Sequence, residues 1–102
     1  MDIVLVTGGS GLLGSALMAR WRRSGRALLP VGHRIRPEAG RTVDLEAVSA
    51  VAELARWEWG AVVHCAAFRS PDFCEVESAR AVRLNAEVPE ELAWLSAASW
   101  EA

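Results

Sequence analysis

The sequence of 102 residues predicts a single α/β domain built on a parallel β-sheet. Three short apolar runs, at residues 3–6, 27–31 and 61–65, alternate with segments of helical periodicity. Apolar runs without polar alternation are typical of strands that are buried on both faces, as in parallel sheets. With right-handed crossovers, this alternation predicts a parallel sheet with helices packed against it.

Glycines follow the first apolar run at once. Residues 7–14 read TGGSGLLG, which fits both the spacing TGxxGxxG and the looser spacing GxGxxG. A helix predicted over 12–23 begins there and ends before Gly25, a residue suited to a left-handed C-cap. A helix N-terminus offers free N–H groups to a pyrophosphate, and glycine lets the phosphate approach the backbone. The turn therefore predicts a dinucleotide site, and the alternative is a tight turn without a ligand.

The later elements continue the pattern of strands and helices. We expect a loop over 32–40, a second helix from Asp44 to a point before Gly60, and a helical stretch over 74–99. Pro89 must kink that last stretch or start a new helix in it, and Pro30 predicts an edge or an end for the second strand. The apolar stripe predicted for the second helix consists of Leu45, Val48, Val51, Ala52 and Ala55.

Charge and composition exclude several classes of protein. A net charge of −2 argues against a nucleic-acid-binding or membrane-surface role. The N-terminus has no signal-peptide pattern and no apolar run has the length of a membrane span, so we expect a cytoplasmic protein without a membrane partner. Cys65 and Cys74 are then expected to be reduced thiols rather than a disulfide or a metal site.

The segment after the second strand bears on the choice of cofactor. In a dinucleotide fold, an acid about 20 residues beyond the glycines holds the ribose 2′-OH of NAD. Here residues 31–36 contain no acid, but they contain Arg34 and Arg36, whose guanidinium groups could pair with a 2′-phosphate. This pattern favours NADP over NAD, and a solvated basic loop is the alternative.

The glycine pattern near the N-terminus resembles that of the extended short-chain dehydrogenase/reductase family. The segments 64–75, HCAAFRSPDFCE, and 83–89, RLNAEVP, are similar to the branch that contains dTDP-4-dehydrorhamnose reductase. The non-catalytic β subunit of methionine adenosyltransferase belongs to the same branch. The resemblance covers the whole chain, from Val4 to about Leu95, and implies a Rossmann-like fold with a bound dinucleotide. That fold has three layers, α/β/α, and the strand order 3-2-1.

The resemblance also implies roles for single residues. Asp44, with Leu45, would lie beside the adenine ring, although a helix N-cap is an equal alternative for Asp44. Ala66 and Ala67 would pass against the ribose and diphosphate, and Asn85 would support the active-site helix. An acidic pair at 72 and 75 matches the branch, with helix capping as its simpler role. The predicted cofactor-binding residues are Thr7, Gly8, Ser10, Gly11, Leu12, Leu13, Gly14, His33, Arg34, Arg36, Asp44, Leu45, Cys65, Ala66, Ala67 and Asn85.

One chemical absence limits the expected activity. Reductases of this family use a Tyr followed four residues later by a Lys, and the 102 residues contain neither Tyr nor Lys. We therefore expect residues 1–102 to be the N-terminal half of an NAD(P)-binding domain, from a sugar-nucleotide reductase whose catalytic and substrate-binding part is absent. Two alternatives stay open: a non-catalytic nucleotide-binding regulatory module, and a gene fragment without independent function. In the strand order 3-2-1 the first strand would be a bare edge, which predicts self-association through it.

Overall fold

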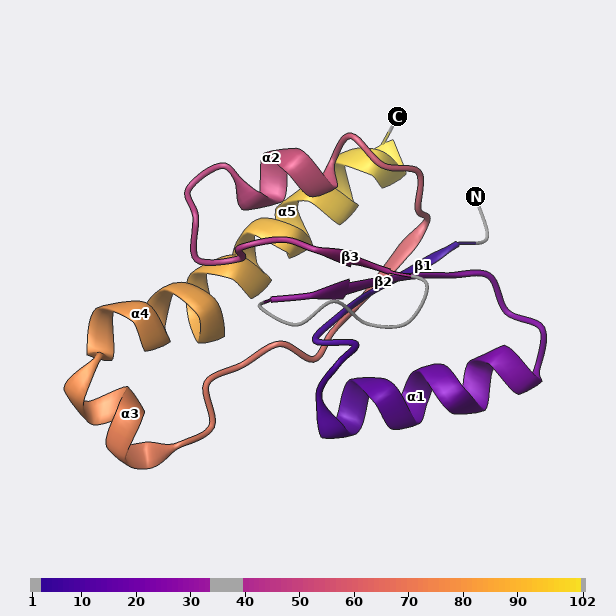
Figure 1. Cartoon of the computed structure of the whole chain (residues 1–102). Helices are drawn as coiled ribbons and strands as arrows, with labels where there is room; N and C mark the ends of the chain where they lie inside the picture. The colour runs from indigo at the N-terminus through magenta and orange to yellow at the C-terminus, as the bar shows by residue number, and fades with distance from the viewer. Residues whose placement is uncertain (1–2, 34–39, 102) are drawn as a thin grey trace.

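The computed structural model describes residues 3–33 and 40–101, without the side chains of 97–101. Its centre is a sheet of four parallel strands in the order β3-β2-β1-β4, seen nearly edge-on in Figure 1. The strands are β1 (Val4–Thr7), β2 (Leu28–Gly32), β3 (Arg41–Thr42) and β4 (Ala61–His64). The predicted α/β class and the parallel sheet are confirmed.

The position of β1 differs from the prediction. The strand over 61–64, which the sequence pattern placed third, pairs with β1 on the side opposite to β2. The strand that pairs with the outer side of β2 is β3, which the sequence pattern did not predict. It has only two residues, both exposed, and so it contains no apolar run. Because β1 lies between two partners, the prediction that it forms a bare edge is wrong, and self-association through it loses its basis.

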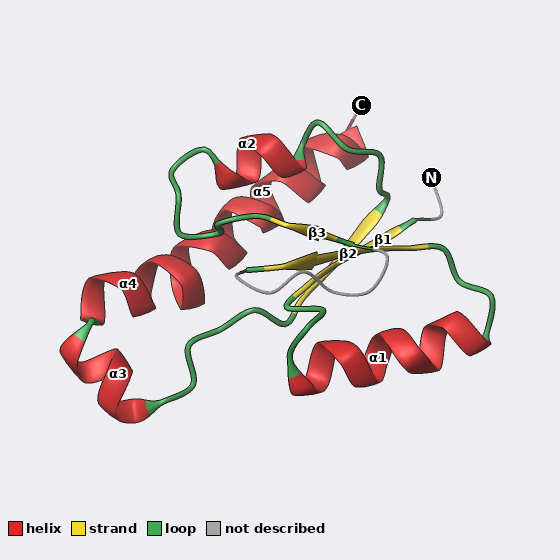
Figure 2. Cartoon of the chain, viewed as in Figure 1, coloured by secondary structure: helices red, strands yellow, loops and turns green. Residues whose placement is uncertain are grey.

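Helices cover both faces of the sheet and make the predicted three layers. Helix α1 (Leu12–Arg23) lies on one face, while α2 (Ala50–Leu54) and α5 (Val88–Glu101) lie on the other (Figure 2). Val4 and Val6 of β1 pack with Met18 of α1, and Leu5 points into the larger core on the opposite face. The β1 strand is therefore buried on both faces, as its unbroken apolar run predicts.

The second helix is shorter than predicted. It begins at Ala50 rather than near Asp44, because the segment between them forms turns in which Asp44 Oδ1 accepts the N–H of Glu46 at 3.1 Å. Of the predicted stripe, only Val51 is a buried residue of α2, whereas Leu45 is buried but lies before the helix. Val48 is 93% exposed, because it precedes the helix in a turn. The other two stripe residues, Ala52 and Ala55, are exposed as well.

The predicted helical stretch over 74–99 is four consecutive elements. They are α3 (Pro71–Val76), α4 (Ser78–Val82), a π-helical turn η1 (Arg83–Glu87) and α5. Ser70 caps α3 by accepting the N–H of Phe73 at 3.3 Å. Pro89 is the second residue of α5, which continues from η1 without a break. The wider η1 turn comes just before the proline, which has no N–H to donate to the preceding turn. Of the described helices, none is both long and apolar enough to cross a membrane.

Pro30 lies in β2, an inner strand that is locally an edge at the proline on the side of β3, as predicted. The N–H and C=O of one strand residue point the same way, and Gly32 C=O accepts from Val43 on the β3 side while Val31 C=O accepts from Gly9. Pro30 therefore also faces the β3 side. Within residues 3–33 and 40–101, β3 pairs with Val31 and Gly32 and not with the proline, so no ladder hydrogen bond is lost there.

Candidate functional site

The glycine turn joins β1 to α1 at the carboxyl end of the sheet. Gly8 has a φ of +68°, and a Cβ there would lie 2.6 Å from the Ala66 nitrogen. A Cβ on Gly14 would overlap the carbonyl oxygen of Gly8. A Cβ on Gly11 would meet only that same oxygen, at 3.3 Å. Gly8 and Gly14 are thus required by the fold itself, whereas a Cβ on Gly11 would have one tight contact, which a small shift of the Gly8 carbonyl could relieve.

The start of α1 leaves its backbone donors free. Gly11 is the N-cap and has no side chain to accept a hydrogen bond, and the first turn contains no acidic residue. The first backbone bond back into the helix runs from the Ser15 N–H to the Gly11 carbonyl at 2.9 Å. The N–H groups of residues 12–14 therefore have no acceptor within the helix, so this end suits an anion.

A pocket of about 270 Å³ opens over this turn. Its walls come from the glycine turn, from the end of β2, from the chain after β4 and from η1. The lining residues are Gly8, Ser10, Gly11, Leu12, Leu13, Gly14, His33, Cys65, Ala66, Ala67, Phe68, Arg69 and Leu84. Leu12 and Leu13 are 78% and 61% exposed, which is unusual for two adjacent leucines and is typical of a surface that receives a ligand.

The sequence prediction and the pocket lining overlap in part. Three lining residues were missed, namely Phe68, Arg69 and Leu84. Phe68 and Arg69 directly follow Ala67. Their position just after a strand, at the end of the sheet where ligands bind, could have predicted them. No sequence signal marked Leu84, because it reaches the pocket only through the packing of η1. Four predicted residues do not line the pocket: Thr7, Asp44, Leu45 and Asn85. Arg34 and Arg36 lie outside the described residues.

Thr7 joins the carboxyl ends of β1 and β4 behind the pocket. Its fully buried hydroxyl oxygen accepts the N–H groups of Cys65 at 3.1 Å and Ala66 at 3.3 Å. It lies 2.6 Å from His64 Nδ1, and since it already accepts twice, its own proton is directed to that nitrogen. Burial lowers the pKa of His64, only partly opposed by the Leu84 backbone, so this histidine is neutral. Thr7 thus positions the pocket wall.

Asn85 holds another part of the wall. Its side-chain oxygen accepts the N–H of Phe68 and its side-chain nitrogen donates to the carbonyl of Phe68, both at 2.9 Å. This pair of bonds fastens the chain after β4 to η1. The role resembles the structural support that the family resemblance implies for this asparagine.

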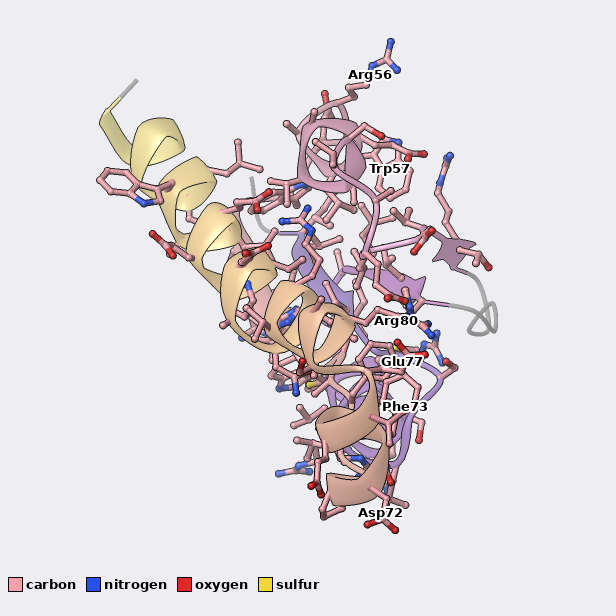
Figure 3. All side chains as sticks on the ribbon, turned by 90° about the vertical axis from the view of Figure 1, so that its left-hand side faces the viewer. Arg56, Trp57, Asp72, Phe73, Glu77 and Arg80 are labelled. Carbon is pink, nitrogen blue, oxygen red and sulfur yellow. The ribbon has the colours of Figure 1, made fainter. Side chains whose placement is uncertain are left out.

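A cluster of charged and aromatic side chains closes the pocket beside β2. His33 Nδ1 accepts the N–H of Leu45 at 3.1 Å, so the ring proton is on Nε2, which donates to Glu46 Oε2 at 2.9 Å. Arg80 donates to both carboxylate oxygens of Glu46, at 2.6 and 3.1 Å. The guanidinium of Arg80 also lies over the rings of Phe68 and Phe73, at 5.4 and 5.2 Å (Figure 3).

The ion pair at Glu46 has a clear electrostatic effect. The hydrogen bond from Arg80 lowers the pKa of Glu46 to about 2, with His33 helping and burial opposing. Asp44 and Glu46 place oxygens near the ring of His33, but both ring nitrogens and both oxygens of Glu46 already have partners. We therefore assign no metal site to this cluster.

The reactive side chains near the pocket do not form a catalytic pair. Burial raises the pKa of the Cys65 thiol, which makes it a poor nucleophile at neutral pH. Both ring nitrogens of His33 are occupied, and His64 does not line the pocket. Among the described residues, the arrangement can bind an anion and a flat ring system, but it offers no positioned proton donor.

Comparison with known proteins agrees with this geometry. Residues 1–100 match the family described as RmlD substrate binding domain. The chain belongs to this family. It is 38% identical over 90 residues, 87% of its length, to a probable dTDP-4,6-dihydroxy-2-methyloxan-3-one 4-ketoreductase from Streptomyces antibioticus. The resemblance to the branch of dTDP-4-dehydrorhamnose reductase is thereby confirmed.

Two further relatives extend the comparison. Methionine adenosyltransferase 2 subunit beta from Xenopus tropicalis is 33% identical over 90 residues, 87% of this chain. The crystal structure of a short-chain dehydrogenase/reductase superfamily protein from Agrobacterium tumefaciens, with bound NAD, superposes with a TM-score of 0.73. That match is 29% identical and covers 94% of this chain and 29% of that one. The chain spans 28% and 27% of the lengths of the two curated relatives.

Proposed function

We propose that this chain binds a nicotinamide dinucleotide, with the pyrophosphate at the glycine turn and at the start of α1. The observation that carries the proposal is the start of α1 at Gly11, which has no capping side chain, so its first backbone N–H groups are open to an anion. The exposed leucines at 12 and 13 support it, since they line the same pocket. The NAD bound to the Agrobacterium protein supports the class of ligand.

We propose NADP as the preferred form, because residues 31–36 contain two arginines and no acid. Within a longer protein, these residues would supply the cofactor half of a reductase that transfers hydride to a nucleotide-sugar ketone. The likeness to the Streptomyces protein, a probable 4-ketoreductase, supports that substrate class. A regulatory role without chemistry is the second candidate, favoured by the absence of Tyr and Lys from the 102 residues and by the likeness to the methionine adenosyltransferase subunit.

The binding proposal is tested by Gly11→Val. Its side chain would lie over the turn and press on the Gly8 carbonyl oxygen, so we expect at least a tenfold loss of NADP and NAD affinity with a fall of only a few degrees in melting temperature. Calorimetric titration and thermal unfolding measure the two effects. Ala19→Val, at an exposed site on α1, is the matched control and should bind like the wild type. Unchanged affinity in Gly11→Val would refute the proposed phosphate position.

The two candidate roles are separated by a reductase assay. A positioned general acid typically contributes 10²–10⁴-fold to such a reaction, and the described pocket offers none. We expect the 102-residue chain to bind NADPH without oxidising it in the presence of a nucleotide-sugar ketone. Steady turnover by the purified chain would show that a residue of these 102 replaces the missing Tyr and Lys.

A further inference from the structure

A pair of side chains joins the two strands whose ends form the pocket. Thr7 is the last residue of β1, His64 is the last residue of β4, and the two are paired in the sheet. Thr7 Oγ1 lies 2.6 Å from His64 Nδ1. Neither residue lines the pocket, but the residues that follow them, Gly8 and Cys65, do line it. A change in this pair therefore reaches the pocket through the next residue of each strand.

The hydroxyl group of Thr7 has no spare capacity to accept a hydrogen bond. A hydroxyl offers one proton and two lone pairs, and the N–H groups of Cys65 and Ala66 occupy both lone pairs. The proton then points to His64 Nδ1, which must be an acceptor. The Cys65 N–H has a second acceptor in the Thr7 carbonyl, at 3.1 Å. Within the described part of the chain, the Ala66 N–H depends on the hydroxyl.

The Ala66 peptide in turn packs against the glycine turn. Its nitrogen is so close to Gly8 that a Cβ on the glycine would lie 2.6 Å away. Ala66, Ala67 and Phe68 are consecutive residues of the pocket wall. The hydroxyl of Thr7 thus fixes this wall against the turn that is proposed above to bind the pyrophosphate.

A protonated His64 does not fit this arrangement. Its Nδ1 would direct a proton at an oxygen whose lone pairs are filled, so the bond from the Ala66 N–H would be given up. Its Nε2 is buried near the Leu84 backbone, and no well-formed hydrogen bond from the described residues compensates a charge there. Burial accordingly lowers the pKa of His64.

The charged side chains of the elements around His64 are engaged elsewhere. Strand β1 contains no titratable residue, and His64 is the only one in β4. On η1, Arg83 lies 3.8 Å from Glu87 and also pairs with Glu91 of α5. Burial raises the pKa of the adjacent Cys65 thiol, which is therefore neutral. The protonation of His64 is thus governed by its burial and by Thr7.

We propose that His64 is a positioning residue, whose neutral imidazole orients the Thr7 hydroxyl so that it holds Ala66 and keeps the pocket in its binding form. Protonation of His64 releases the Ala66 N–H, so nucleotide binding weakens as the pH falls. The effect on affinity rests on the proposed dinucleotide function, whereas the effect on the Ala66 amide does not.

The test is calorimetric titration with NAD at about pH 7.5 and about pH 5. NAD is the probe because the 2′-phosphate of NADP itself titrates near pH 6. His64→Leu has no acceptor, whereas His64→Asn keeps one in the place of Nδ1 and does not titrate. At the higher pH we expect His64→Leu to bind about fivefold more weakly than the wild type, the order of effect of one hydrogen bond, and His64→Asn to match the wild type.

At the lower pH the order of affinities should change. The wild type should fall to the level of His64→Leu, and His64→Asn should bind about fivefold more tightly than both. His33 titrates in all three proteins, so its effect cancels from the comparison. Val63→Ala is the control for lost stability, because Val63 packs on the α1 side of the sheet. It should lower the melting temperature and leave NAD affinity unchanged.

Hydrogen exchange at the Ala66 amide, measured without nucleotide at about pH 7.5, separates the inference from the proposed function. Exchange should be faster in His64→Leu than in the wild type and in His64→Asn. If the wild type binds neither NAD nor NADP, the proposed function fails, and faster exchange in His64→Leu still supports the role of His64. Equal exchange in the three proteins overturns that role. Equal affinities of His64→Asn and His64→Leu at the higher pH overturn it too, as does an equal loss in Val63→Ala.

Discussion

The two ends of the pocket are built in different ways. At the glycine turn, backbone packs on backbone: Gly8, Gly14 and the chain at Ala66 approach too closely for any side chain between them. At the His33 end, the wall is held by side chains, through the pairs His33–Glu46 and Glu46–Arg80. The first end comes from eight consecutive residues that pack on the chain at Ala66, and the second comes from side chains of three separate segments.

This difference predicts different responses to mutation and to pH. The backbone packing at the glycine turn involves no titratable group and leaves no space for an added side chain. Substitution of Gly8 or Gly14 should therefore disturb the fold itself. The ion pair can be removed with less damage, because partly exposed pairs contribute modestly to stability, but its strength depends on protonation.

The largest effect is expected at Gly8. Gly8→Ala combines a left-handed backbone with a Cβ 2.6 Å from the Ala66 nitrogen, and should lower the free energy of unfolding by about 3 kcal/mol. Gly25→Ala is the matched control, with a φ of +78° and no atom within 4 Å of the added Cβ. It should cost only about 1 kcal/mol. Urea unfolding of both variants measures the difference, and equal losses would mean that the turn yields to a side chain.

A somewhat smaller loss is expected at Thr7. Thr7→Val keeps the shape but removes the oxygen that accepts from Ala66 and faces His64, and should destabilise the fold by about 2 kcal/mol. Cys65 keeps one acceptor, because its N–H also reaches the Thr7 carbonyl at 3.1 Å. Thr7→Ser retains the hydroxyl and should recover most of the stability by chemical denaturation. If Ser and Val behave alike, the methyl group rather than the hydroxyl is what matters.

The side-chain end should respond to pH. The pKa of Glu46 falls from 4.5 to about 2 in the fold, so its contribution is complete above about pH 4.5 and is lost as the pH falls toward 2. Glu46→Gln should therefore be less stable than the wild type at pH 7, and the two should converge as the pH approaches 2. Thermal unfolding between pH 2 and 7 measures this. A difference that stays constant over the range would contradict the assigned ion pair.

The smallest effect is expected where η1 meets the pocket. Asn85→Ala removes two hydrogen bonds to the backbone of Phe68 at an exposed site, and should cost about 1 kcal/mol. The matched control is Ala86→Ser, an exposed neighbour without such bonds. Hydrogen exchange at the Phe68 amide should rise in the first variant only. Unchanged exchange there would show that other contacts hold this part of the wall.

Structural features that depend on neighbouring residues could be predicted from the sequence more accurately than features that depend on distant ones. The strand, glycine turn and helix over residues 4–23 follow from adjacent residues, and they were predicted almost to the residue. The second helix was predicted too early, because Leu45 is buried by tertiary packing rather than by a helical stripe. The helical segment is irregular at Glu77 and at η1. Apart from Pro89, no local sequence pattern indicates either irregularity.

By itself, the sequence determined the parallel α/β class, the glycine turn and most of the residues that line its pocket. Only the tertiary structure decided that β1 is central, because β3 is too short and exposed to be seen as an apolar run. It also decided that Thr7 and Asn85 hold the wall rather than line it, and that Glu46 pairs with Arg80. A glycine turn is specified by steric limits within a few residues, whereas a hydrogen-bonded ion pair depends on where distant segments come to lie.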